Sequence, residues 1–220
     1  MTSGATDPHR DQPVLTAGRP LAEARAAMIL LHGRGADGED MLGLARHLHH
    51  PELAYLAPEA AGRTWYPERF TAPREANEPW LGSALARVGA LVEEIAAAGV
   101  PTEHQILLGF SQGACLACDL VARHPRRYGG LAALTGGLIG PPGTAFEDLT
   151  GDLAGTPAYL AGGDPDPHVP WSRVEETAEA LRRLGAEVTV RRFPGLGHTV
   201  HPAQIAVVRR MVENLVPGRR

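Results

Sequence analysis

One segment of the sequence constrains the fold more than any other. From Gln105 an apolar run, the pentapeptide Gly-Phe-Ser-Gln-Gly and a helical pattern follow one another directly. Gly109 and Gly113 flank Ser111, as expected for a turn so tight that side chains beside it would collide with neighbouring backbone. A Gly-x-Ser-x-Gly sequence alone is weak, because glycine and serine are abundant. Between a strand and a helix, however, it predicts the sharp turn that exposes a serine hydroxyl at the edge of a sheet.

The rest of the chain alternates short apolar runs with helical patterns, which indicates an α/β fold with a mostly parallel central sheet. The predicted strands are 26–31, 53–56, 105–108, 131–134, 158–160 and 187–191, with 14–17 as an antiparallel edge strand; the predicted helices are 40–48, 80–98, 112–123, 172–184 and 203–215. Two long connections, 58–79 and 136–156, are expected to be functional or mobile. We expect residues 14–220 to form one domain after a disordered leader over residues 1–13.

Composition narrows the chemistry. All 21 residues counted as Lys or Arg are Arg. The absence of lysine excludes Schiff-base enzymes, Ser-Lys dyads, phosphate-binding loops and protein kinases. A formal net charge of −4, without a basic run longer than a pair, disfavours nucleic acid and anionic membranes as partners. The same charge favours a small neutral or weakly charged substrate. Because no membrane-length apolar stretch or signal-peptide pattern is present, we expect a cytoplasmic protein.

A serine hydroxyl is a weak nucleophile until a base removes its proton. The turn around the serine therefore predicts a carboxylate and then a histidine further along the chain. Asp164 and Asp166 follow one predicted strand, and His198 follows the next on a glycine-rich loop. The carboxyl ends of strands are the edge where open α/β sheets hold their sites. His201 competes with His198, but it opens the last helix. The residues alone leave the choice between the two aspartates open.

The tetrahedral intermediate of acyl transfer carries a charged oxygen that needs hydrogen-bond donors. In enzymes with this turn, one donor is the backbone amide after the nucleophile, which here belongs to Gln112. The loop Leu31-His-Gly-Arg-Gly-Ala-Asp37 follows an early buried strand and can present a second amide, that of Arg34. The glycines would serve a plain strand-to-helix turn equally well. The combination of this loop with the serine turn favours the oxyanion role.

Other residues offer two alternatives. Cys115 and Cys118 form a Cys-x-x-Cys pair, which is either a redox motif or two small residues of a helix core. The histidine cluster at 47–50 lies near a helix end, but no Cys or carboxylate set at ligand spacing accompanies it, so we expect no metal. The histidines predicted as surface groups are His9, His104 and His124.

Five segments together resemble the phospholipase/carboxylesterase family of α/β-hydrolases, to which acyl-protein thioesterases belong. They are LHGRGAD at 31–37, RTWYPERF at 63–70, GFSQGA at 109–114, GGDPDPHVP at 162–170 and GHT at 197–199. Their order and spacing match the family from about Val14 onward. The resemblance implies an α/β-hydrolase fold with helices on both faces of the sheet and no large lid domain. It also implies hydrolysis of carboxylic esters or thioesters of short to medium acyl chain, without a cofactor.

The resemblance selects the acid, because the family places it in a G-x-x-D-x-x-V-P pattern. Asp166 has that position, and Asp164 is left as a loop residue. An aromatic pair in the second segment matches residues beside the substrate groove, although in a proline-rich loop it could equally cap the core. His168 replaces an aliphatic residue of the family, so it either influences pH behaviour and substrate charge preference or is simply exposed. The predicted substrate-binding residues are Trp65, Tyr66, His32 and His168.

The sequence thus predicts a serine carboxylesterase. Ser111 attacks the carbonyl, His198 takes its proton and passes it to the leaving group, and Asp166 orients the imidazole. Alternatives within the class are a lysophospholipase and an acyl-protein thioesterase; outside it, a catalytically silent binding protein on the same fold. The expected partner is a small-molecule ester or thioester, with no nucleic acid and no stable membrane association. A homodimer stays open as an alternative to a monomer.

Overall fold

The computed structural model describes residues 7–216. They contain one seven-stranded sheet, with the strands in the order β1-β3-β2-β4-β5-β6-β7. Strand β1 is antiparallel to β3, and all other pairs are parallel. The strands are β1 (Val14–Gly18), β2 (Ala26–Leu31), β3 (Leu53–Pro58), β4 (Gln105–Phe110), β5 (Gly130–Leu134), β6 (Pro157–Asp164) and β7 (Glu187–Pro194). The α-helices are α1 (Gly38–Ala45), α2 (Trp80–Ala97), α3 (Gln112–Arg123), α4 (Trp171–Arg183) and α5 (Pro202–Leu215), and short 3-10 turns cover Leu21–Glu23, Arg46–Leu48, Ala61–Arg63, Arg74–Asn77 and Thr102–His104.

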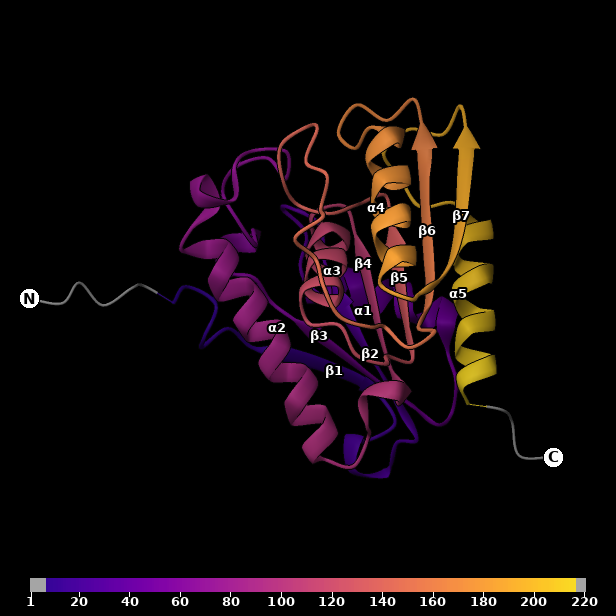
Figure 1. Cartoon of the computed structure of the whole chain (residues 1–220). Helices are drawn as coiled ribbons and strands as arrows, with labels where there is room; N and C mark the ends of the chain where they lie inside the picture. Colours follow the sequence, from indigo (N-terminus) through magenta and orange to yellow (C-terminus); the bar gives the residue numbers. More distant parts are fainter. Residues whose placement is uncertain (1–6, 217–220) are drawn as a thin grey trace, which may run out of the picture.

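The helices cover both faces of the sheet (Figure 1). On one face α2, α3 and α4 share a hydrophobic cluster with Ala27, Ile29 and Leu31, and on the other α1 and α5 share a second cluster with the alternate residues of β2. Strand β2 is therefore buried along its whole length, as expected for a parallel strand inside a three-layer fold. Burying one such leucine side chain stabilises the fold by about 1.5–3 kcal/mol.

The predicted elements are present, with differences at their ends. Strands β6 and β7 run further than predicted, to Asp164 and Pro194, and pair in register over that extension. Gly163 makes this possible, because a Cβ at that position would lie 1.9 Å from the carbonyl oxygen of Leu196. The extension brings the loop after β6 close to the loop after β7. These are the two loops from which the predicted acid and histidine come.

The two long connections contact each other and are held by buried polar groups. The backbone N–H of Gly140 donates to the carbonyl of Phe70 at 2.9 Å, which joins one connection to the other. Arg173 of α4 is almost fully buried and donates to three carbonyls of the second connection, those of Leu138, Gly140 and Pro141, at 2.8–2.9 Å. Its guanidinium also lies 5.6 Å from the centre of the Phe70 ring. Arg173 thus fixes both connections to the body of the fold.

Of the described N-terminal residues, 7–13, His9 is buried in the fold, and most of the others are exposed. Residues 1–6 of the predicted leader lie outside the described residues, so the expectation for 1–13 is corrected from residue 7 onward. The backbone N–H of His9 donates to the Ser83 hydroxyl of α2 at 2.9 Å, which fixes this segment to a helix far along the chain. Part of the predicted leader is therefore attached to the rest of the fold.

His9 is fully buried, which corrects its predicted place at the surface. Its ring lies 5.6 Å from that of Trp65 and 5.4 Å from that of Trp80, measured between centroids. Nε2 donates to the carbonyl of Trp65 at 3.0 Å, and Nδ1 accepts from the backbone N–H of Ala61 at 3.1 Å. These two bonds select the neutral ring. Burial accordingly lowers the pKa of His9.

This lowered pKa predicts a pH dependence of stability. The unfolded chain protonates His9 near pH 6.5, about the ordinary value, whereas the folded protein keeps it neutral to lower pH. The contribution of His9 to the free energy of unfolding is therefore complete above pH 6.5. It decreases as the pH falls below that value, by up to about 1.4 kcal/mol per pH unit. We expect urea unfolding to show a smaller free-energy difference between wild type and His9→Gln at about pH 5.5 than at about pH 7.5. An equal difference at both pH values would contradict this.

Candidate active site

Ser111 lies in the sharp turn between β4 and α3, at the carboxyl edge of the sheet. Its backbone is in a rarely adopted region, with φ 54° and ψ −116°. The flanking glycines are required by close backbone contacts: a Cβ on Gly109 would lie 2.3 Å from the carbonyl oxygen of Gly113, and one on Gly113 would lie 2.1 Å from that of Leu31. The turn is thus packed against its own second half and against β2, and it holds the serine side chain above the sheet.

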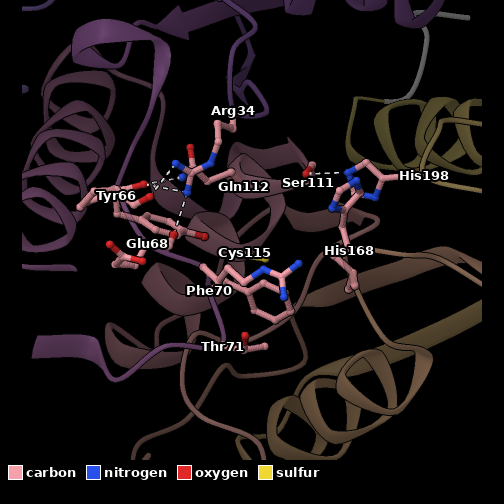
Figure 2. A pocket seen from close by; sticks show the side chains of 13 residues that line it. Arg34, Tyr66, Glu68, Phe70, Thr71, Ser111, Gln112, Cys115, His168 and His198 are labelled. Atoms are coloured by element: carbon pink, nitrogen blue, oxygen red, sulfur yellow. Dashed lines mark hydrogen bonds between the residues drawn. The ribbon is translucent and has the colours of Figure 1, made fainter. Parts of the chain in front are cut away.

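Three side chains from three loops form a continuous hydrogen-bonded series. His198 Nε2 lies 2.8 Å from Ser111 Oγ (Figure 2), and His198 Nδ1 lies 2.8 Å from Asp166 Oδ2. The Asp166 side chain is fully buried, whereas 19% of the His198 side chain is exposed. A carboxylate on the Nδ1 side fixes the tautomer in which Nε2 is free to accept a proton from the serine. The arrangement suits proton transfer from Ser111 to His198.

The loop after β6 holds Asp166 in place. Its Oδ1 accepts the backbone N–H groups of His168 and Val169 at 2.7 and 2.9 Å. Asp164 instead forms an ion pair with Arg192 of β7 and is absent from the hydrogen-bonded series. The structure therefore separates the two aspartates that the residues alone left open. His201, the competing histidine, caps α5 by accepting from the backbone N–H of Ala203 at 3.1 Å.

The two predicted oxyanion donors both lie at the cavity beside Ser111. The backbone N–H groups of Arg34 and Gln112 have no hydrogen-bond partner among residues 7–216. Gln112 is the first residue of α3, whose N–H has no acceptor within the helix. A helix N-terminus also favours negative charge. Free backbone amides can donate to the charged oxygen of a tetrahedral intermediate.

The cavity has a volume of about 420 Å³ and opens beside Ser111 and His198 (Figure 2). Tyr66 and His168, two of the predicted substrate-binding residues, line it, and the His168 ring lies 4.7 Å from that of His198, centroid to centroid. Sequence reasoning missed the other seven lining residues. Pro67, Glu68, Arg69, Phe70 and Thr71 follow the recognised aromatic pair in a loop without periodicity, and the remaining two are Cys115 of α3 and Val169 in the loop after β6.

Trp65 and His32, the other two predicted substrate-binding residues, do not line the cavity, and the structure places them in the protein interior. Both are fully buried. Their rings lie 4.9 Å apart between centroids, and Trp65 Nε1 donates to the carbonyl of His32 at 2.9 Å. His32 Nε2 in turn accepts from the backbone N–H of Ala60 at 3.1 Å. The two residues thus hold the backbone around the loop after β2. The aromatic pair was expected either beside the substrate groove or capping the core, and Trp65 has the second position.

The cysteine pair lies inside α3, with both thiols buried. Burial raises the pKa of Cys115 to about 11 and raises the pKa of Cys118 well above its ordinary value. Because the thiolate is the reactive form, these environments disfavour the redox reading. Within residues 7–216, no three His, Cys, Asp or Glu side chains are grouped as a metal site. No helix in that part of the chain is long and apolar enough to cross a membrane.

A mostly parallel sheet with a serine turn after β4, and an acid and a histidine after β6 and β7, defines an α/β-hydrolase. The chain belongs to the phospholipase/carboxylesterase family, whose sequence model matches residues 18–216. It is thereby a hydrolase of carboxylic esters. Among residues 7–216 no large lid domain is present, in agreement with the sequence prediction.

Individual relatives agree with this assignment. A crystal structure of a phospholipase/carboxylesterase from Dyadobacter fermentans DSM 18053 has a TM-score of 0.89 and 42% identity, covering 95% of this chain and 99% of its own. NocK of Nocardia uniformis subsp. tsuyamanensis, whose name assigns it as an esterase, is 33% identical over 182 residues, which are 80% of this chain and only 48% of NocK. The mouse lysophospholipase-like protein 1 is 23% identical over 217 residues, 90% of either chain.

Proposed function

We propose that the chain is a serine esterase that cleaves carboxylic esters or thioesters of short to medium acyl chain through an acyl-enzyme on Ser111. The observation that carries this proposal is the hydrogen-bonded series of Ser111, His198 and the buried Asp166 beside a cavity. All three side chains come from loops at the carboxyl edge of the sheet. A catalytically silent binding protein would not need to retain all three.

In the first half of the reaction, Ser111 Oγ attacks the substrate carbonyl while its proton moves to His198 Nε2. The resulting imidazolium donates from Nδ1 to the carboxylate of Asp166, which stabilises the positive charge. The carbonyl oxygen becomes negative and accepts from the backbone N–H groups of Arg34 and Gln112. Removing one oxyanion donor typically costs about 10²–10³-fold in kcat, so two aligned amides contribute substantially to the rate.

In the second half, His198 gives its proton to the departing alcohol or thiol, and the acyl group remains on Ser111. Water then enters and attacks the acyl carbonyl while His198 removes a proton from it, which forms a second tetrahedral intermediate. As this intermediate collapses, the bond between the carbonyl carbon and Ser111 Oγ breaks, His198 returns the proton to Ser111 Oγ, and the free acid leaves. Bonds and protons balance without a redox partner. Apart from the substrate and water, each group in this scheme is a side chain or backbone amide of the protein.

Cavity size supports the short to medium acyl chain. Ligand pockets for small molecules span about 300–1,000 Å³, and the 420 Å³ cavity lies toward the lower end of that range. Phe70, Val169 and the aromatic ring of Tyr66 give it apolar wall area suited to an acyl chain. Lysophospholipase and acyl-protein thioesterase activity are the second candidates, favoured by the names of two relatives, lysophospholipase-like protein 1 and acyl-protein thioesterase 1 of Gibberella zeae.

A chain-length series tests the substrate class. We expect kcat/KM for p-nitrophenyl esters to be highest at short to medium acyl length and to fall for palmitate, because a chain longer than the cavity must leave its apolar tail in water. Lysophosphatidylcholine and palmitoyl-CoA, assayed beside the series, serve as the comparison. A rise in kcat/KM that continues to palmitate, or faster turnover of either lipid, would contradict the proposal in favour of the second candidates.

A further inference from the structure

The side chain of Arg34 makes an unusual set of contacts. Its guanidinium donates to three backbone carbonyls in a row, at 2.9 Å to Tyr66, 2.8 Å to Pro67 and 2.7 Å to Glu68 (Figure 2). It has no carboxylate partner among residues 7–216. A guanidinium whose N–H groups donate to several consecutive backbone carbonyls holds that stretch of main chain in place. The segment 64–68, which carries these carbonyls, is called the brace segment below.

The other proposed oxyanion residue holds the same segment. The side-chain amide of Gln112 accepts from the backbone N–H of Trp65 at 2.9 Å and donates to the carbonyl of Tyr66 at 2.8 Å. The Tyr66 carbonyl therefore accepts from both Gln112 and Arg34. Both residues that offer a free backbone amide to the cavity thus hold the brace segment with their side chains. The brace segment therefore contacts both residues whose backbone N–H groups are the proposed oxyanion donors.

The loop that carries the Arg34 amide has little other support on its outer side. Gly35, the next residue, has φ +82°, and nothing lies within 4 Å of the position where its Cβ would be. A backbone hydrogen bond from Gly35 N–H to the carbonyl of Arg63 at 2.8 Å joins this loop to the residue before the brace segment. No packing therefore supports the loop at Gly35, and the hydrogen bonds of the Arg34 side chain and of the Gly35 N–H join it to residues 63–68.

We propose that the Arg34 side chain is a positioning residue for the oxyanion hole, which sets the direction of its own backbone N–H by tying its loop to the brace segment. This role rests on the proposed function. Oxyanion donors act only within about 2.7–3.1 Å of the charged oxygen, and a displacement of about 1 Å can cost about 10²-fold in rate. Arginine suits the task because its planar fork reaches three carbonyls at once, whereas a lysine ammonium is a single compact donor.

The test compares Arg34→Ala and Arg34→Lys with wild type on a p-nitrophenyl ester. We expect kcat to fall by about 10–100-fold in both variants while KM changes by less than about threefold, because the alignment of the donor matters in the transition state. Methylguanidinium is expected to restore part of the kcat of Arg34→Ala, and methylammonium is not. Arg34→Lys retains the charge and the aliphatic stem, so it reports even if the alanine variant folds poorly.

The matched control is Arg126→Ala. Arg126 pairs with Glu93 at 2.7 Å, has a side chain that is 42% exposed and does not line the cavity. The kcat of this variant should stay within about twofold of wild type. A wild-type kcat in Arg34→Ala, a loss confined to KM, or an equal loss in Arg126→Ala would overturn the positioning role alone. An inactive wild type would instead overturn the proposed function and this role with it.

Discussion

Gly113→Ala is expected to destabilise the protein by about 3 kcal/mol or more, at or beyond the upper end of ordinary overpacking costs. The new Cβ would lie 2.1 Å from the carbonyl oxygen of Leu31 and 2.6 Å from that of His32. Both are backbone atoms at the end of β2, so neither can rotate away as a flexible side chain would. Since domains are stable by only about 5–15 kcal/mol, urea unfolding should show a large decrease in the midpoint.

The control is Gly43→Ala, inside α1. Nothing lies within 4 Å of the Cβ position at Gly43, and its backbone is helical. Alanine is better than glycine in a helix, so this variant should be stabilised by about 0.5–1 kcal/mol. If Gly113→Ala unfolded at the wild-type midpoint, the packing of the serine turn against β2 would be wrong.

The serine turn could be predicted because its cause is local. Gly109, Ser111 and Gly113 must be close in sequence to form a tight strand-to-helix turn, and the apolar strand and the helical pattern on either side are equally local. The sheet and its helices follow from periodicity in the same way. Prediction was therefore accurate where short-range sterics and repeating burial determine the structure.

The surroundings of the site depend on contacts between distant residues, and these could not be predicted. His9 is buried because Trp65 and Trp80 enclose it. Its backbone N–H donates a hydrogen bond to Ser83, 74 positions away. His32 gave a misleading signal: a polar residue beside the site suggests substrate contact, yet its hydrogen bonds go to the supporting backbone. Without a periodic pattern, a loop residue that supports the site resembles one that touches the substrate.

Arginine usage illustrates the same limit. Composition shows only that no lysine is present, and it leaves arginine as solvated charge. In the structure, Arg34 and Arg173 each donate to three backbone carbonyls and so fix the two long connections. Which arginines do this depends on where those connections run. That path is set by long-range contacts and not by composition.

Ser111→Ala is expected to lower kcat on a p-nitrophenyl ester by about 10⁵–10⁶-fold, the scale of losing the nucleophile in a serine hydrolase. The oxyanion amides and the cavity would remain, so a small rate above water would persist. The free energy of unfolding should change by less than about 1 kcal/mol, because the hydroxyl is replaced by hydrogen without a change in packing. Activity and stability are thus expected to separate in this variant.

The two histidines of the C-terminal region provide the comparison. His198→Ala should lose nearly as much activity as the serine variant, because the two residues act as a unit. His201→Ala should keep kcat within a few-fold and lose about 1 kcal/mol of stability, since His201 only caps α5. Equal activity losses in both histidine variants would show that the wrong histidine has been placed beside Ser111.

The most direct measurement is covalent trapping of the nucleophile. A fluorophosphonate reacts with a serine whose proton is removed by a neighbouring base, and it leaves a stable tetrahedral adduct. We expect the intact mass of the wild-type protein to increase by one adduct, and peptide mapping to locate it on Ser111. Ser111→Ala should stay unlabelled under the same conditions. An unlabelled wild type, or an adduct on any other residue, would contradict the account.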